Sequence, residues 1–350
     1  MLEKNIAFLR GAQEKDGAYG SQRNMLLTDL WENPESHRSW RVATSAIVAM
    51  AFLDHDDPQD FERVDRALDY VIANSDLKRP SDWDTDDVWG LVYGLQGCAH
   101  ALKHPHYRDG ERADRLRRAA KDFLARLERR QSPRGGFGYY ADADAAWRSE
   151  WATTFTTSNA ILALVEAREA GIEFDAKMLE AAMKAVHHCR TPEGSFTYDV
   201  QPIAVPSSLE SIDHVQGSLG RIQVCNFALV RGGEKVPETT ITWGLDQFFR
   251  QHRFLDCARM RPIPHEAYYK NAGYFWCYAH LYAGEVIGTL SDERRAEYGP
   301  KLWAELAKVM KDDGSLWDYP YMDFTHVYGT AFSAVAILRT LPRGKNTGPE

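Results

Sequence analysis

The stretch Gln131-Ser132-Pro133-Arg134-Gly135-Gly136-Phe137-Gly138-Tyr139 decides the fold, because related stretches recur along the chain. Each follows an amphipathic segment, places Gly before an aromatic residue, and precedes a more apolar segment. A helix commonly ends in a left-handed residue, which only Gly adopts cheaply. The pattern therefore predicts a repeated unit of helix, turn and helix. The other clear copies are Gln13-Glu14-Lys15-Asp16-Gly17-Ala18-Tyr19, Thr191-Pro192-Glu193-Gly194-Ser195-Phe196 and Lys311-Asp312-Asp313-Gly314-Ser315-Leu316-Trp317.

The spacing of these turns predicts how many units the chain holds. Gly194 follows Gly135 by 59 positions, Gly314 follows Gly194 by 120, and Gly135 follows Gly17 by 118. The two longer intervals are about twice the shorter one, so less regular copies are expected near residues 76 and 255. The chain is therefore predicted to contain six helical hairpins.

The second helix of each unit is nearly all apolar or small, which is typical of a buried helix, whereas the first helices carry a charged face. Six buried helices inside six amphipathic ones predict an all-α (α/α)6 toroid at 1–341, with a flexible tail at 342–350. An open solenoid would have the same period. We favour closure because the polar residues of the apolar helices cluster at their N-terminal ends. These helices are expected at 43–53, 88–102, 154–165, 217–230, 272–287 and 327–338.

Composition narrows the possible partners and surroundings. The net charge of −8 and the absence of a Lys/Arg stripe argue against nucleic-acid binding. No apolar run approaches the roughly 20 residues that span a bilayer, so no stable membrane insertion is expected. The start of the chain lacks an apolar signal core, and the five separated cysteines resemble buried thiols, so a cytoplasmic location is expected. The oligomeric state stays open.

The apolar helices are expected to begin at one common rim, where their N-terminal partial positive charges point toward a cavity. Many aromatic residues lie near the expected starts of these helices, and they are candidates for binding a substrate. Arg221, in a Gly-rich first turn, would suit an anion, or would pair with Asp213 or Glu210. The candidate aromatic residues are Trp40, Trp89, Tyr93, Trp151, Tyr269, Tyr274, Trp276 and Tyr328.

The repeats, with their Gln-x-x-x-Gly-x-aromatic and Asp-Gly-Ser-Leu-Trp turns, resemble those of squalene/hopene and other class II terpenoid cyclases and of protein prenyltransferase beta subunits. The resemblance covers nearly the whole chain, and it implies a hydrophobic isoprenoid substrate. Asp84-Thr85-Asp86-Asp87 has the Asp-x-Asp-Asp form of the cyclases. By that resemblance Asp86 would protonate a double bond, with Asp84 and Asp87 adjusting its pKa. The alternative is a solvated acidic turn that caps a helix.

The prenyltransferase comparison predicts that no metal and no other cofactor is bound at the corresponding place. His326 stands at the position of a zinc ligand in those subunits, but Asn271 and Gly273 replace the other two ligands. Zinc in a catalytic site needs at least three protein donors. His326 would then be either a polar cavity residue or a histidine bonded locally at a helix start.

Three functions remain possible on the sequence. The first is a class II terpenoid cyclase that starts the reaction by proton transfer from Asp86. The second is a module that binds a lipid or a peptide without chemistry. The third is a glycoside hydrolase or lyase, in which Asp86 or Glu150 would stand opposite Asp323 across a cleft.

Overall fold

The computed structural model describes residues 1–21, 34–80, 84, 86–139, 151–200, 210–320 and 323–342. This part of the chain is all-helical and contains no strand, only isolated β-bridges. The apolar helices are α2 (Pro34–His55), α4 (Val88–Lys103), α6 (Thr154–Glu169), α8 (Leu219–Gly232), α11 (Phe275–Thr289) and α13 (Phe324–Thr340). The amphipathic helices are α1 (Leu2–Gly11), α3 (Phe61–Ala73), α5 (Gly110–Glu128), α7 (Ala176–His188), α9 (Glu238–Arg250) and α12 (Asp292–Val309), with the short α10 (Arg253–Asp256) after α9.

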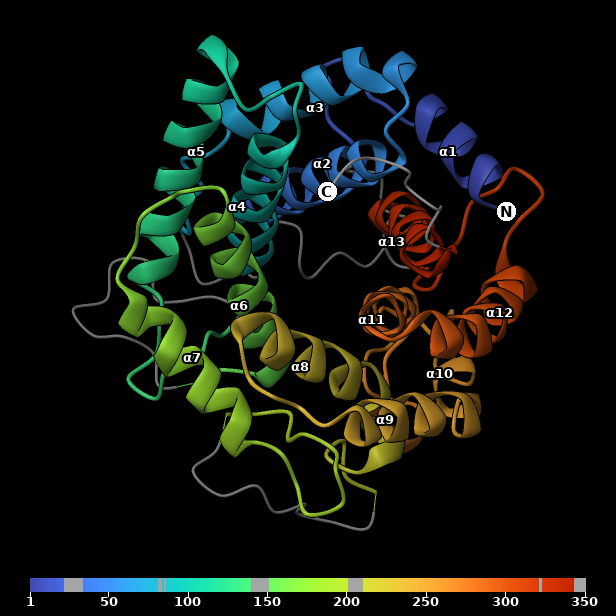
Figure 1. Cartoon of the computed structure of the whole chain (residues 1–350). Helices are drawn as coiled ribbons and strands as arrows, with labels where there is room; N and C mark the ends of the chain where they lie inside the picture. Colours follow the sequence, from blue (N-terminus) through green and yellow to red (C-terminus); the bar gives the residue numbers. More distant parts are fainter. Residues whose placement is uncertain are drawn as a thin grey trace.

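The helices form two concentric rings, with the apolar helices inside and the amphipathic helices outside (Figure 1). Each inner helix packs against the next one around the ring, from α2 to α13. The ring is closed because α13 packs against α2, and α1 packs against α13. The predicted toroid is therefore confirmed, and an open solenoid does not describe the chain.

The four glycine turns pack each hairpin against its neighbour. Their glycines have φ between +86° and +90°, as the left-handed turn requires. A Cβ at these positions would collide with an outer helix: Gly17 contacts Arg66 of α3, and Gly314 contacts Lys4 of α1. The last turn thus packs on the first helix of the chain. Glycine is needed here both for its backbone conformation and for this close approach. The other two turns contact α7 and α9 in the same way, through Gly135 and Gly194.

The glutamine of the repeat fixes the turn and the neighbouring helix together. The Gln131 side-chain amide donates to the carbonyl oxygen of Gly135 at 2.9 Å and to that of Met178 in α7 at 2.8 Å. Gln13 makes the same pair of bonds one third of the ring away, to Gly17 at 3.0 Å and to Arg63 of α3 at 2.9 Å. These bonds explain why Gln recurs at this place in the sequence.

Three details complete or correct the expected helices. Helix α2 begins at Pro34 rather than near 43, so Trp40 lies in its second turn and not in its first.

Of the five cysteines, four are buried and Cys257 is partly buried, and all are free thiols. No helix of the described residues is long and apolar enough to cross a membrane. Most of the tail, residues 343–350, lies outside the described residues.

Candidate active site

The acidic tetrad lies just before α4, at the end of the toroid where the inner helices begin. Asp84 and Asp87 are buried, with 2% and 1% of their surface exposed. Asp87 forms an ion pair with Arg130, and its side chain makes no capping hydrogen bond. The tetrad is therefore not a solvated acidic turn, and that alternative is wrong for these two residues. Thr85 lies outside the described residues.

Other groups satisfy the first N–H groups of α4. The Val88 N–H donates to the carbonyl oxygen of Tyr139 at 3.1 Å. The Gly90 N–H donates to the hydroxyl oxygen of Ser39 at 3.1 Å. The Trp89 N–H donates to the backbone carbonyl oxygen of Asp86 at 3.2 Å, so these first N–H groups are bonded without the carboxyl groups of Asp86 and Asp87.

Within the described part of the chain, the Asp86 carboxyl group has no hydrogen bond and no ion pair, whereas Asp87 is paired with Arg130. Its side chain is half-buried, and its backbone has φ +59°, a conformation that Asp tolerates better than most residues. Desolvation by burial, together with the nearby charge of Asp87, raises the pKa of Asp86 to about 7. The charge of Arg130 is directed to Asp87 instead. Asp86 is thus a carboxyl group that retains a proton near neutral pH.

An aromatic cluster lies near this acid. Phe155 of α6 is its centre, with ring centroids 5.8 Å from Trp89, 5.6 Å from Tyr139 and 5.5 Å from Tyr198. Burial and neighbouring charges, that of Asp86 among them, raise the pKa values of Tyr139, Tyr198 and Tyr274, which places these phenols near the acid. We use the name aromatic cluster for Trp89, Tyr139, Phe155, Tyr198, Tyr274, Phe275 and Tyr278.

Several sequence-predicted residues lie in this cluster or against it. Trp89 and Tyr274 belong to it, and Tyr93 stacks on Trp89 with centroids 6.1 Å apart. The pKa of Tyr328 is raised by burial and by several neighbours, Tyr274 among them, so this residue also lies beside the cluster. These four were predicted from their common level at the start of the inner helices.

Arg221 lies against the cluster but is not paired with a carboxylate. Its guanidinium is centred 5.3 Å from the ring of Tyr198 and is 3% exposed. It donates to the carbonyl oxygens of Phe196 and Ile212. Burial lowers the pKa of Arg221, while Asp213 nearby opposes this without a direct ion pair. The expected pairing with Asp213 or Glu210 is therefore not found among the described residues.

Three of the aromatic residues that were predicted to bind substrate lie away from the cluster. Trp276 is 1% exposed and stacks on His280 at 3.7 Å, so α11 directs it toward α10. Trp40 packs on Phe324 at 5.9 Å. Tyr269 packs on Phe254 at 5.0 Å, beside α10. Their position near the start of the inner helices could not show where these side chains point, because only some faces of each inner helix point inward.

Trp151 and His326 lie at the periphery. The Trp151 side chain is 36% exposed and donates to Asp199 at 3.0 Å, and its ring contacts the edge of the cluster at Tyr139, 5.1 Å away. His326 lies in a surface groove beside α1, 2.8 Å from the Lys311 ammonium. The histidine is therefore not a residue of the acid site.

Asp323, one member of the carboxylate pair expected for a glycoside hydrolase, lies immediately before α13. Asp323 lies in the same surface groove as His326 and is 3.3 Å from it. Glu150 lies outside the described residues. Sequence analysis missed Asp318, whose pKa burial raises to about 7. However, Asp318 is fully buried and accepts from the Cys277 N–H at 2.8 Å, so it serves the start of α11.

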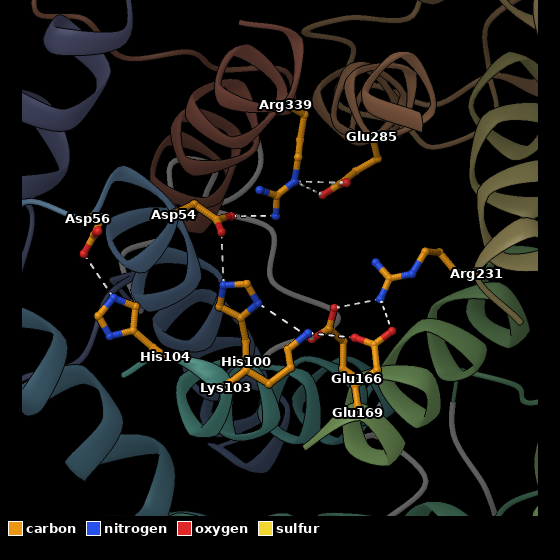
Figure 2. Close-up of polar contacts among 10 residues, drawn as sticks. All are labelled: Asp54, Asp56, His100, Lys103, His104, Glu166, Glu169, Arg231, Glu285 and Arg339. Carbon is orange, nitrogen blue, oxygen red and sulfur yellow. Dashed lines mark hydrogen bonds and ion pairs between the residues drawn. The ribbon is translucent and has the colours of Figure 1, made fainter. Parts of the chain in front are cut away.

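The opposite end of the toroid carries a feature that the sequence analysis also missed. One charged side chain comes from near the end of each inner helix, and the signs alternate around the ring (Figure 2). These side chains line a cavity of about 60 Å³ between the helix ends. This cavity lies at the end opposite to the predicted one. We call this set the charged ring: Asp54, His100, Glu166, Arg231, Glu285 and Arg339.

Ion pairs connect the charged ring from Glu285 to Arg231. Arg339 is 2.7 Å from Asp54 and 3.2 Å from Glu285. His100 is 3.1 Å from Asp54 and 3.7 Å from Glu166, which in turn is 3.4 Å from Arg231. The signal for this ring was present in the sequence as one charged residue near the end of each otherwise apolar segment.

His100 and Asp54 keep their charges at neutral pH despite their burial. Burial opposes the charged form of His100, but Asp54 and Glu166 together raise its pKa to about 9. Burial likewise opposes the charge of Asp54, yet His100 and Arg339 hold its pKa at about 2. The ring is therefore a set of compensated charges that joins the six inner helices at this end.

Comparison with known proteins shows the fold but no family. No protein-family model and no curated protein matches the chain. Among solved structures, the type II terpene cyclase MstE from Scytonema is 14% identical over 96% of each chain, with a TM-score of 0.54. An α-1,6-mannanase of Salegentibacter is 12% identical over 96% of this chain and 99% of its own, with a TM-score of 0.61. An unsaturated glucuronyl hydrolase of Bacillus is 12% identical over 99% and 100%, with a TM-score of 0.61.

Proposed function

We propose that the protein is a class II terpenoid cyclase-like enzyme that starts the cyclisation of a linear isoprenoid by proton transfer from Asp86. The observation that carries this proposal is the Asp86 carboxyl group, which has no hydrogen bond within the described part of the chain, a pKa raised to about 7 and aromatic side chains near it. The toroid fold is also that of MstE, whose structures include a complex with its substrate geranylgeranyl dihydroxybenzoate.

The proposed step is balanced in atoms and charge. The Asp86 hydroxyl transfers its proton to one carbon of an isoprenoid double bond, and the electron pair of that bond forms the new C–H bond. The other carbon becomes a cation, which further double bonds attack to close rings. A carbon next to the final cation then loses a proton to a base or to water, so the product is an isomer of the substrate. Water afterwards returns a proton to the Asp86 carboxylate.

The aromatic cluster would stabilise the cations formed in this sequence. A cation over an aromatic face gains about 2 kcal/mol or more where water is excluded. Trp89 and Phe155 offer such faces, and Tyr274 lies on the other side of the cluster. Arg221, which is buried beside Tyr198, would orient an anionic head group of the substrate away from the developing cation.

Asp87 and Arg130 would have a different role from that of Asp86. Burial raises the pKa of Asp87, and the ion pair with Arg130 opposes this rise. A carboxylate beside Asp86 raises the pKa of Asp86, so that it holds its proton. We therefore assign Asp87 and Arg130 as positioning residues for the acid.

A second candidate is a glycoside hydrolase. It is favoured by the inactive mannanase variant in which two consecutive aspartates are replaced by alanine, since Asp86 and Asp87 are also consecutive. Against it, Asp87 is 1% exposed and paired with Arg130, so only one of the two carboxyl groups is free for a substrate. Glycoside hydrolysis needs two carboxyl groups at the scissile bond.

The test is to incubate the protein with squalene, with linear prenyl diphosphates and with prenylated aromatic acids, and to analyse the extract for cyclic isomers. We expect a cyclic product from at least one isoprenoid. Because Asp86 must be protonated to react, the rate of cyclisation should fall about tenfold per pH unit above pH 7. Mannose release from α-1,6-mannan would instead support the hydrolase. A retained lipid without turnover would support the binding module and contradict the proposal.

A further inference from the structure

A group of three side chains outside the acid site has the composition and geometry of a metal site. His252 immediately precedes α10, Asp256 ends that helix, and Glu305 comes from α12, which lies beside it (Figure 1). The Nδ1 atom of His252 is 3.0 Å from an Asp256 oxygen and 3.5 Å from a Glu305 oxygen. All three ligand atoms lie within 4.8 Å of one another.

The neighbouring residues fix which nitrogen of His252 carries a hydrogen. His280 is fully buried, and its Nδ1 is 2.7 Å from the carbonyl oxygen of Trp276, so that nitrogen donates. The Nε2 atoms of His280 and His252 are 3.0 Å apart and share one hydrogen. A charged His280 is unfavourable at full burial without a carboxylate contact, so His280 accepts and His252 donates through Nε2.

This assignment leaves the Nδ1 atom of His252 facing two carboxylates. A lone pair there would repel both oxygens, so the position needs a proton or a metal cation. Donor atoms in a tetrahedral zinc site lie about 3.3 Å apart, since zinc bonds to nitrogen and oxygen are about 2.0–2.2 Å long. The separations of 3.0 and 3.5 Å found here are close to that value.

The surrounding hydrogen bonds are those of a built metal site. The ring of His252 is 5% exposed and held by His280 through its second nitrogen. The other oxygen of Asp256 accepts from the indole N–H of Trp276 at 2.9 Å. Such outer hydrogen bonds orient ligands and raise metal affinity. The Lys308 ammonium now contacts Glu305 at 2.6 Å, but its side chain is 62% exposed and free to move away.

We propose that His252, Asp256 and Glu305 bind one zinc ion, with water as the fourth ligand, and so join the outer parts of the fifth and sixth hairpins. Zinc fits this set because imidazole together with carboxylates suits it better than calcium or magnesium. Its charge would also balance the two carboxylates. The site uses none of the residues of the acid site, so the proposal stands independently of the proposed function.

The chain contains a matched control. His55, Asp57 and Asp60 form a second group of the same kind among the described residues. There, however, the Arg10 guanidinium already contacts Asp60 at 2.8 Å and Asp57 at 3.1 Å, so a cation already compensates these carboxylates. We expect this group to bind no zinc.

The experiment measures Zn²⁺ binding to the chelator-treated full chain by titration calorimetry and by metal analysis after dialysis. We expect one Zn²⁺ per chain and a Tm raised by a few degrees. Binding should weaken at least tenfold in His252→Gln and in Glu305→Gln, the second being a near-surface change that should not disturb folding. His55→Gln should bind as the unchanged protein does, and Lys308→Gln at least as tightly.

Two results would overturn the proposal. One is the absence of stoichiometric Zn²⁺ binding to the unchanged chain. The other is binding that persists in both His252→Gln and Glu305→Gln but is lost in His55→Gln, which would assign the ion to the control group. The absorption spectrum of the Co²⁺-loaded chain adds a separate readout, since a tetrahedral site gives intense visible bands.

Discussion

Asp86→Asn is expected to abolish formation of the cyclic product while making the protein more stable at neutral pH. The amide cannot deliver a proton to a double bond, so the rate should fall by at least about 10²–10⁴-fold, the usual contribution of a general acid. The measurement is product formation by the variant under the conditions that give cyclisation with the unchanged chain. Asp312→Asn, at an exposed position, is the matched control and should retain full activity.

The gain in stability follows from the sign of the pKa shift. The folded chain holds the Asp86 proton up to about pH 7, whereas an unfolded Asp releases it near pH 3.8. The folded state therefore binds more protons between these values, and the unchanged chain loses stability as the pH rises from about 4 to 7. Asp86→Asn escapes this loss, which amounts to up to about 4 kcal/mol above pH 7 and vanishes near pH 3. Urea unfolding of the variant and of the unchanged chain at pH 3 and pH 8 tests this. Equal stability of the two proteins at pH 8 would contradict the assigned pKa.

Arg339→Met should destabilise the toroid by about 3 kcal/mol. The guanidinium pairs with Asp54 and Glu285, whose side chains are 11% and 17% exposed, and its loss leaves both carboxylates with a missing partner. Removal of one member of a buried ion pair typically costs about 3–5 kcal/mol. The lower end applies because the Arg339 side chain is itself 33% exposed. The measurement is the free energy of unfolding in urea at pH 7.

Two controls separate this effect from a loss of packing. Arg294→Met removes an exposed arginine whose pair with Glu297 spans 2.8 Å, and it should cost about 0.5 kcal/mol or less. In Arg339→Met the loss should shrink toward pH 4, because Asp54 and Glu285 then take up protons in place of the lost partner. A loss that is the same at pH 4 and pH 7 would contradict the electrostatic account of the charged ring.

The architecture could be predicted from the sequence because the repeat carries its own geometry. Gly135 and Gly314 mark turns that need a left-handed residue and have no room for a side chain. The near-complete burial of α4 and α6 was visible as segments without a charged face. Closure of the ring was favoured because the polar residues of the apolar helices cluster at their N-terminal ends, and the contact of α13 with α2 confirms it.

The site was only partly predictable, because the position of a residue along a helix does not tell which way its side chain points. Asp86 and Trp89 lie near one aromatic cluster, whereas Trp276, which was expected at the same end of its helix, faces α10. The start of α2 was placed too late, which put Trp40 in a first turn that it does not occupy. The pairing of Asp87 with Arg130 joins residues 43 positions apart, and no local pattern reveals it.

The charged ring was missed for a related reason. A single charge near the C-terminal end of an apolar segment is, by itself, no different from an ordinary exposed helix end. His100 is one such residue, and only the closed ring brings it between Asp54 of α2 and Glu166 of α6. Three-dimensional closure, rather than any one segment, produces the alternation of charge.

The most direct test of the proton transfer is to run the cyclisation in D2O and weigh the product. Asp86 exchanges its proton with the solvent, so each cyclised molecule should carry one deuterium at the carbon that receives the first proton, and its mass should exceed that of the product made in H2O by one unit. A cyclic product without deuterium, or a deuterated product made equally well by Asp86→Asn, would contradict the account.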